Sequence, residues 1–350
     1  MFRLTGPTVL LCAGHALADA LPMRVPLRFD QGFWNASFSV GPQNFNLSVD
    51  TGSFAVIIGQ GLYKPNPTSV QTNMGEFIQF NGANEDGTLM ASETFFFVRD
   101  EIDFAGVSLS DFLVGNITVG DPIRDGILGL SPPASQITDP NDPTFLAGQS
   151  LAQTICSQQS ISPCEFGLEL KFDGTGSLIF GPMNDTMITG NITTLKTQSN
   201  DAWITLNDTA EDSPLLVIND QPFTHIIAIF DNGTPNIIGP IETVRAALLS
   251  VGYNISETSD SSGASFVFGT YDCASPARFG FSFPPSTEVH YIDAGANVLN
   301  RTADGLICTA NILGASTTDL WLIGQTWFQG RYVQHNLNAS TLAFADLADA

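Results

Sequence analysis

The chain has 350 residues, which is enough to bury a sizeable core and to form either two domains or one large one. Its 12 lysines and arginines against 35 aspartates and glutamates give a formal net charge of −23, which argues against nucleic acids and anionic membranes as partners. The 32 glycines, 20 prolines and 26 phenylalanines, with only 13% charged residues, are typical of a loop-rich β protein. The acidic balance fits a protein that works in acid, and it fits equally well a surface that only aids solubility.

Residues 1–20 predict a secretory signal peptide. Arg3 precedes an apolar run over residues 9–13, and small residues follow up to Ala18 and Ala20, either of which suits the cleavage site. The run is too short to span a membrane, no later stretch is long and apolar enough, and the C-terminal tail carries no lipid-anchor signal. We therefore expect a secreted, extracellular protein without a membrane anchor.

Cysteines and sequons agree with secretion. Removal of the signal leaves Cys156, Cys164, Cys273 and Cys308, and an even number in an oxidising compartment indicates disulfides. Four cysteines allow three pairings. Sequons lie at Asn35, Asn46, Asn116, Asn184, Asn191, Asn207, Asn254, Asn300 and Asn338.

The segment Ser48-Val49-Asp50-Thr51-Gly52-Ser53 places one carboxylate on a tight turn. Apolar and polar residues alternate over 45–49, which predicts a half-buried strand that ends at Asp50. Gly52 lets backbone amides approach the carboxylate, and Ser53 adds a hydroxyl that can donate a hydrogen bond to it. An Asp-Gly near a strand end is also a common plain turn, so the motif alone is a weak signal.

Two further segments follow in the first half. Residues 75–98 predict a β-hairpin, with turn candidates at Asn81-Gly82 and Asp86-Gly87. Residues 125–130 form a short apolar segment that contains a glycine. Asp125, at its start, is expected to be a loop or structural carboxylate and not a third catalytic group.

A second copy of the Asp motif lies 181 residues after the first, at residues 227–234. Again an apolar strand delivers an aspartate, Asp231, and a glycine and a hydroxyl follow it. Each aspartate also has a later apolar-apolar-Gly segment, 125–130 after Asp50 and 320–324 after Asp231, at 79 and 93 residues counted to the glycines. This repeat predicts a duplicated lobe.

Together these motifs resemble the pepsin-like aspartic protease family of secreted, fungal-type acid proteases over nearly the whole secreted length. The resemblance implies a mostly β, bilobal pepsin-like acid protease fold, with two β-barrel-like lobes and a cleft between them. The N-terminal lobe would cover 21–188, with the first catalytic Asp and a flap, and the C-terminal lobe 189–350. Asp50 and Asp231 would be the catalytic pair. Sequence proximity and the family pattern favour a Cys273–Cys308 disulfide, which leaves Cys156 with Cys164.

The resemblance also assigns supporting roles. Thr51, Gly52 and Ser53 would support the first aspartate, and Asn232, Gly233 and Thr234 the second. The family has Thr where this chain has Asn232, so the expected hydroxyl geometry is lost, although an amide can donate and accept. Asn232-Gly233-Thr234 is also a formal sequon, and an active site would require that it carry no glycan.

Three apolar residues are expected to line substrate subsites by the same resemblance. Phe80 stands where the family has the flap tyrosine, and Ile57 stands where it has that tyrosine's tryptophan partner. Ile127 is the third. A core role is open for the two isoleucines. Pepsin-like enzymes carry a basic prosegment after the signal, and here the strands are expected to begin too early to leave room for one.

We therefore expect a monomeric endopeptidase that cleaves polypeptides in acid, beside apolar side chains, through two Asp that share a proton. No metal or organic cofactor is expected, because the remaining histidines lack metal-ligand spacing and nucleotide and serine-hydrolase motifs are absent from the sequence. The alternative is a catalytically impaired pepsin-fold protein that binds a peptide or glycan in its cleft. A secreted lectin of unrelated fold would leave the duplicated motif unexplained.

Overall fold

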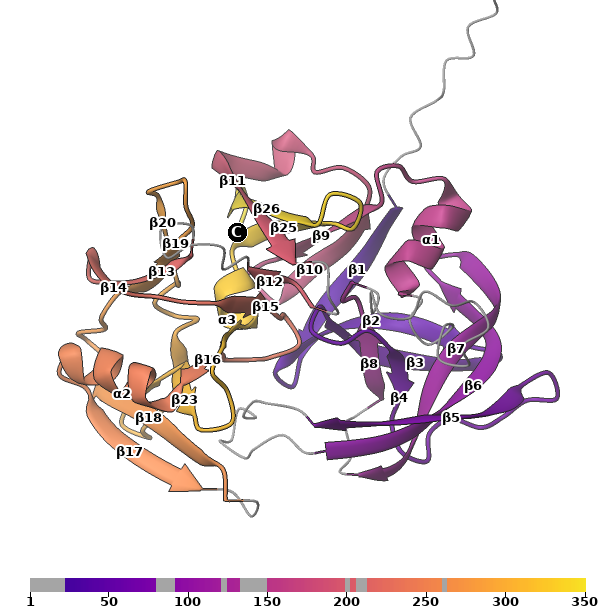
Figure 1. Ribbon diagram of the computed structural model, residues 1–350, viewed down its shortest axis with the longest axis horizontal. Coiled ribbons are helices and arrows are strands. Elements are labelled where there is room, and N and C mark those ends of the chain that lie inside the picture. Colours follow the sequence, from indigo (N-terminus) through magenta and orange to yellow (C-terminus); the bar gives the residue numbers. More distant parts are fainter. Residues whose placement is uncertain are drawn as a thin grey trace, which may run out of the picture.

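The computed structural model describes residues 23–79, 92–120, 125–132, 150–198, 202–205, 213–259 and 263–350. Figure 1 shows two lobes, one in indigo to magenta and the other in orange to yellow. Strands dominate the described part of the chain, and its helices are short. The prediction of a mostly β, bilobal fold is confirmed. The predicted signal peptide lies outside the described residues.

An antiparallel sheet runs through both lobes and joins them. The first half contributes β1, β9 and β10, and the second half contributes β25, β26 and β11, so that β9 and β25 meet in the middle. The order is β1 (Met23–Asp30), β10 (Thr175–Phe180), β9 (Glu165–Leu170), β25 (Arg331–Asn336), β26 (Thr341–Leu347), β11 (Ile188–Gln198). A short 3-10 helix, Asp185–Met187, precedes β11. The predicted division between residues 188 and 189 falls at the start of β11 and stays a prediction.

The first lobe places β3 and β4 on either side of β8. β8 pairs in parallel with β3 and antiparallel with β4, and β4 pairs in parallel with β7. β5 and β6 form the predicted hairpin, whose connection, 80–91, lies outside the described residues. The elements of this lobe are β2 (Phe33–Val40), β3 (Gln43–Asp50), β4 (Val56–Ile58), β5 (Val70–Gln79), β6 (Ser92–Phe104), β7 (Val107–Gly120), β8 (Gly126–Gly129) and α1 (Leu151–Gln159).

The second lobe repeats this pattern. β24 pairs in parallel with β15 and antiparallel with β16, and β16 pairs in parallel with β23. The elements are β12 (Ile204–Thr205), β15 (Ala228–Phe230), β16 (Ile237–Pro240), α2 (Ile241–Ser250), β17 (Asn254–Ser259), β18 (Ser265–Asp272), β21 (Val298–Arg301), β22 (Ile307–Ala310), β23 (Ile312–Ala315), β24 (Trp321–Ile323) and α3 (Gln325–Phe328). A separate sheet holds β14 (Gln221–His225), β13 (Leu215–Ile218), β19 (Phe279–Ser282) and β20 (Val289–Tyr291).

The main hydrophobic core is continuous between the lobes, because alternate residues of the joining sheet face apolar side chains from both of them. Beneath the second Asp loop, Phe230 packs edge-to-face on Trp327, with ring centroids 5.3 Å apart. His335 is fully buried on β25 and stacks on Phe166 at 4.6 Å. Aromatic rings therefore pack beneath the second Asp loop and on the joining sheet.

Two disulfides brace the lobes. Cys156–Cys164 joins the end of α1 to the start of β9, and Cys273–Cys308 joins the end of β18 to β22, with Cα atoms 5.4 and 5.0 Å apart. These are the pairs that sequence proximity favoured. No helix in the described ranges is both long and apolar enough to cross a bilayer.

Candidate active site

Asp50 is the last residue of β3, which the parallel partner β8 holds in place. The Leu130 N–H donates to the Asp50 carbonyl at 2.7 Å, which fixes the backbone where the strand ends. The carboxylate accepts from the Gly52 N–H at 2.7 Å and the Ser53 N–H at 3.1 Å through Oδ1, and from the Ser53 hydroxyl at 2.6 Å through Oδ2. The sequence pattern thus holds one carboxylate in one orientation.

Asp231 repeats this arrangement in the second lobe. It follows β15, and its N–H donates to the Ile323 carbonyl of β24 at 3.0 Å. Its Oδ1 accepts from the Gly233 N–H at 2.9 Å, and its Oδ2 accepts from the Thr234 hydroxyl at 2.6 Å. Both aspartates therefore have one oxygen on a glycine amide and the other on a hydroxyl.

The two carboxylates face each other across the seam between the lobes. A Cβ atom built on Gly52 would lie 2.5 Å from Cγ of Asp231, and one on Gly233 would overlap the carboxylate of Asp50. Each glycine therefore leaves space for the aspartate of the other lobe. Asp50 is 7% exposed and Asp231 8% exposed. The structure brings together two buried acids from sequence positions 181 residues apart.

Thr51 and Asn232 join the two loops through four hydrogen bonds. The Thr51 hydroxyl donates to the Phe230 carbonyl at 3.1 Å and accepts from the Asn232 N–H at 3.0 Å. In return, Asn232 Oδ1 accepts from the Thr51 N–H at 2.9 Å, and its Nδ2 donates to the Val49 carbonyl at 3.0 Å. The Asn232 carboxamide accepts one hydrogen bond and donates another through two different atoms, whereas the Thr51 hydroxyl does both through its single oxygen. Asn232 therefore still links the two loops, although the family has Thr at this position.

The facing carboxylate of Asp231 alters the titration of Asp50. The pKa of Asp50 is raised well above the usual value for an aspartate, first by burial, then by the charge of Asp231, and then by a side-chain hydrogen bond to Asp231. Hydrogen bonds from Ser53 and Gly52 act in the opposite direction. The pair therefore keeps a proton at a pH at which an isolated aspartate is ionised.

The model of the eukaryotic aspartyl protease family matches residues 35–347, which include both Asp loops. The chain belongs to this family. It is an aspartic-type endopeptidase, and the predicted family and enzyme class are confirmed. It is 23% identical to secreted aspartyl protease 1 of Malassezia globosa over 319 residues, which cover 89% of this chain and 73% of that protein. It is also 23% identical to an aspartic protease of Phaffia rhodozyma over 335 residues, 90% of this chain and 77% of that protein.

The apolar-apolar-Gly segments of this aspartyl protease pass directly behind the Asp loops. A Cβ on Gly129 would lie 2.6 Å from the Ser53 carbonyl, and one on Gly324 would overlap the carbonyls of Thr234 and Asn236. Only glycine allows β8 and β24 to come this close. Asp125, which precedes β8, accepts from the Asn46 N–H at 2.8 Å, so it has the structural role that the sequence suggested.

Of the three residues expected to line substrate subsites, the structure describes Ile57 and Ile127. Ile57 is fully buried and Ile127 is 7% exposed, and both pack in a cluster with Phe95, Phe97 and Leu113. This placement favours the core role that the sequence left open for the two isoleucines. Phe80 lies outside the described residues.

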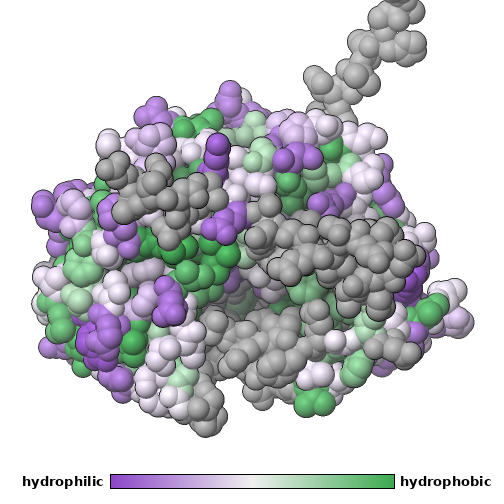
Figure 2. Space-filling model, in the orientation of Figure 1, coloured by the Kyte–Doolittle hydropathy of each residue, from purple (hydrophilic) through white to green (hydrophobic). Residues whose placement is uncertain are grey.

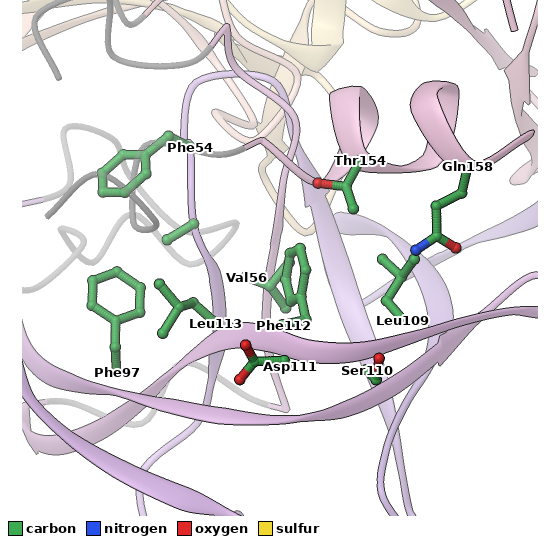
Figure 3. Close-up of a pocket in the computed structure, with 11 residues that line it drawn as sticks. Phe54, Val56, Phe97, Leu109, Ser110, Asp111, Phe112, Leu113, Thr154 and Gln158 are labelled. Atoms are coloured by element: carbon green, nitrogen blue, oxygen red, sulfur yellow. The ribbon is translucent and has the colours of Figure 1, made fainter. Parts of the chain in front are cut away.

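A cavity of about 90 Å³ lies behind the Asp50 loop of the protease. Figure 3 shows Phe54, Phe97 and Leu113 on one side of it and Thr154 and Gln158 on α1 at the other. A water molecule needs at least about 10–15 Å³ of such a cavity, so this one can hold a few water molecules and is too small for a peptide.

A polar network beside the Asp231 loop was missed by the sequence reasoning. The Thr326 hydroxyl donates to the Pro235 carbonyl at 2.7 Å, and Asn311 Nδ2 donates to that hydroxyl at 2.5 Å. Neither Thr326 nor Asn311 belongs to a repeated motif, and no pattern in the sequence links them.

Among the described residues, no three His, Cys, Asp or Glu side chains are grouped as a metal site.

Proposed function

We propose that the chain is a secreted endopeptidase that hydrolyses peptide bonds at acidic pH, with Asp50 and Asp231 as the catalytic residues. The observation that carries the proposal is the reciprocal fit of the two Asp loops, in which each glycine makes room for the other lobe's carboxylate. Binding a peptide needs no such matched pair of acids. Hydrolysis does, because it requires both a base and an acid at the same carbonyl.

The two carboxyl groups divide the chemistry between them. With one proton on the pair, the ionised carboxylate takes a proton from a water molecule, which attacks the carbonyl carbon of the peptide bond. The protonated carboxyl donates a hydrogen bond to the carbonyl oxygen and stabilises the charge that develops there. A proton then passes to the leaving nitrogen, and the carbon–nitrogen bond breaks. A pair that has lost its last proton has no acid, so activity should fall as the pH rises through the raised pKa of Asp50.

The neighbouring residues have positioning roles in this proposal. Gly52 and Ser53 hold Asp50, and Gly233 and Thr234 hold Asp231, through the hydrogen bonds described above. Thr51 and Asn232 keep the two carboxylates at a fixed separation. Asn232 is 1% exposed, so the folded site has no space for a glycan on its sequon.

Several features support a secreted protein that acts on polypeptides. The sequence begins with a predicted signal peptide, and the Malassezia globosa relative is named as secreted. Figure 2 shows the surface hollowed between the two lobes, where an extended chain could lie. We propose lobes over residues 21–188 and 189–350, a monomer, and cleavage beside apolar side chains.

The alternative is a member of the same fold that binds peptide or glycan without cleaving it. Asn232, and Phe80 and Ile57 in place of the family's tyrosine and tryptophan, favour this alternative. The closed Thr51–Asn232 junction removes the first of these arguments.

Digestion of a denatured protein at about pH 3.5, where one proton is expected on the pair, tests the proposal. The wild type should cleave and should be inhibited by pepstatin, while Asp50→Asn and Asp231→Asn should each lose cleavage. Asp125→Asn is the matched control, because it removes a nearby carboxylate but keeps an acceptor for the Asn46 N–H. Equal cleavage by all four proteins would refute the assignment, and no cleavage by any would favour the binding protein.

A further inference from the structure

A cavity of about 430 Å³ lies at the seam between the lobes, next to the Asp231 loop. Phe29 lines it from the first lobe, and Pro235, four residues after Asp231, lines it from the second. Ligand sites in proteins typically have volumes of about 300 to 1,000 Å³. The cavity is thus large enough for a substrate side chain and is placed close to one of the two facing acids.

Half of the residues that line this cavity carry uncharged polar side chains. Every lining residue belongs to the described ranges, and none of them is charged. The polar members are five carboxamides and one hydroxyl, from Asn236, Asn300, Asn311, Gln325, Gln329 and Thr326. A carboxamide both donates and accepts hydrogen bonds, so this lining can pair with either kind of polar group.

Part of the lining is fixed in place by its own hydrogen bonds. Asn311 Nδ2 donates to the Thr326 hydroxyl at 2.5 Å and to the Ala296 carbonyl at 3.2 Å, and Asn311 Oδ1 accepts from Asn236 Nδ2 at 2.5 Å. Thr326 is 2% exposed and Asn236 is fully buried. Side chains that are held before a ligand arrives lose little entropy when it binds.

Other polar groups of the lining have hydrogen-bonding capacity left. Within the described part of the chain, the half-buried side-chain amide of Gln329 and the Nδ2 of Asn300 have no hydrogen-bond partner, and the Asn300 Oδ1 accepts only from the Arg301 N–H. Gln325 is 4% exposed and its Oε1 has no partner among the described residues. Buried polar groups without a partner favour a ligand that supplies one.

We infer that this cavity is a substrate subsite that selects an uncharged hydrogen-bonding side chain, namely Asn, Gln, Ser or Thr, and rejects Lys and Arg. The inference rests on the proposed function, because it requires a polypeptide in the seam beside Asp231. An ammonium or guanidinium group would lose its water there and find no counter-charge among the lining residues. An apolar side chain would leave the carboxamides without new partners.

Because the lining holds no charged residue, the selection of a peptide's acidic side chains should depend on pH. A peptide Asp is neutral below its pKa of about 3.9, where its carboxyl can donate and accept as an amide does. Above that pH it is an anion in a site without cations. Five charged residues lie within two positions of the lining along the chain, and none of them is part of it. Arg28, Asp30, Asp293 and Arg301 are exposed, and the buried Arg331 donates to the Trp327 and Tyr291 carbonyls. The substrate carboxyl should therefore titrate without a local partner.

Kinetics on a peptide series test the inference. One cleavable sequence is varied at each position near the scissile bond through Asn, Asp, Lys and Leu, and kcat/KM is measured at several pH values. At one position Asn should exceed Lys by at least about tenfold at every acidic pH, because the lysine is always charged. At that position the Asn-to-Asp ratio should rise toward about tenfold for each pH unit above about 4. Titration of the enzyme's own acids cancels from this ratio.

A variant at the rim of the cavity sharpens the test. Asn300 is exposed, so Asn300→Lys should fold and should place a cation beside the cavity. It should lower the Asn-to-Asp ratio at about pH 5.5 by roughly two- to fivefold, the range expected for an exposed ion pair. Asn300→Gln is the matched control, because it removes the same sequon but keeps the carboxamide. Asn254→Lys adds an equal charge at an exposed position that does not line the cavity.

The outcomes separate the two proposals. If the enzyme cleaves the whole series and accepts Lys as well as Asn at every position, the subsite is overturned and the protease assignment stands. The same holds if the Asn-to-Asp ratio of kcat/KM does not change with pH. An equal response to Asn300→Lys and Asn254→Lys would overturn it as well. Failure to cleave any peptide would overturn the proposed function and the subsite together.

Discussion

Asn232→Ala should weaken the junction that Asn232 and Thr51 form between the two Asp loops. The substitution removes two side-chain hydrogen bonds, one from the Thr51 N–H at 2.9 Å and one to the Val49 carbonyl at 3.0 Å. Asn232 is 1% exposed, so water does not easily replace them. Each buried backbone group left without a partner costs about 1–3 kcal/mol, so the free energy of unfolding should fall by about 2–6 kcal/mol.

The same change should reduce activity, because the junction sets the separation of the carboxylates. A displacement of about 1 Å at a catalytic site can lower the rate by about a hundredfold. Chemical denaturation gives the stability, and kcat on one peptide gives the activity. Asn232→Thr is the matched control, because one hydroxyl can accept from the Thr51 N–H and donate to the Val49 carbonyl. If the Ala variant were as stable and as active as the Thr variant, the role given to these hydrogen bonds would be wrong.

Two more predictions concern stability. The pKa of the buried His335 is lowered to about 3, so between pH 6.5 and 3 the unfolded chain binds a proton that the folded chain does not, and stability falls as the pH falls. From pH 7 to pH 4 this costs about 3 kcal/mol, and denaturation of His335→Phe at both pH values should show that the variant avoids this loss; an unchanged acid sensitivity would contradict the assignment. Replacing both cysteines of Cys273–Cys308, 35 residues apart, should cost about 4 kcal/mol, against about 2.5 for Cys156–Cys164, 8 residues apart. Equal losses in thermal or chemical denaturation would show that chain entropy is not the main term.

The sequence predicts those parts of the site that depend on local structure. The strand before Asp50, the glycine two residues later and the hydroxyl after it are adjacent in the chain, and their mutual geometry follows from a strand and a tight turn. The second copy at Asp231 could be recognised for the same reason. The need for glycine at Gly52 could be anticipated only in general, because the group it makes room for belongs to the other lobe.

Features that depend on several distant segments could not be predicted in this way. That Asn232 closes the junction depends on where the Val49 carbonyl and the Thr51 N–H lie in the other lobe. That Ile57 is fully buried depends on how the first lobe packs around it. The carboxamide-lined cavity joins residues from Phe29 to Gln329, and no spacing in the sequence connects them.

The pH dependence of kcat/KM on one peptide tests most directly that Asp50 and Asp231 act as a pair that shares a proton. The pKa of Asp50 is raised by burial and by Asp231, so the rate should be highest in acid and should fall as the pair loses its last proton. Asp231→Asn should lose cleavage over this whole pH range. A wild-type rate that still rises near pH 8 would contradict the shared proton, because a pair that has lost its last proton has no acid to supply.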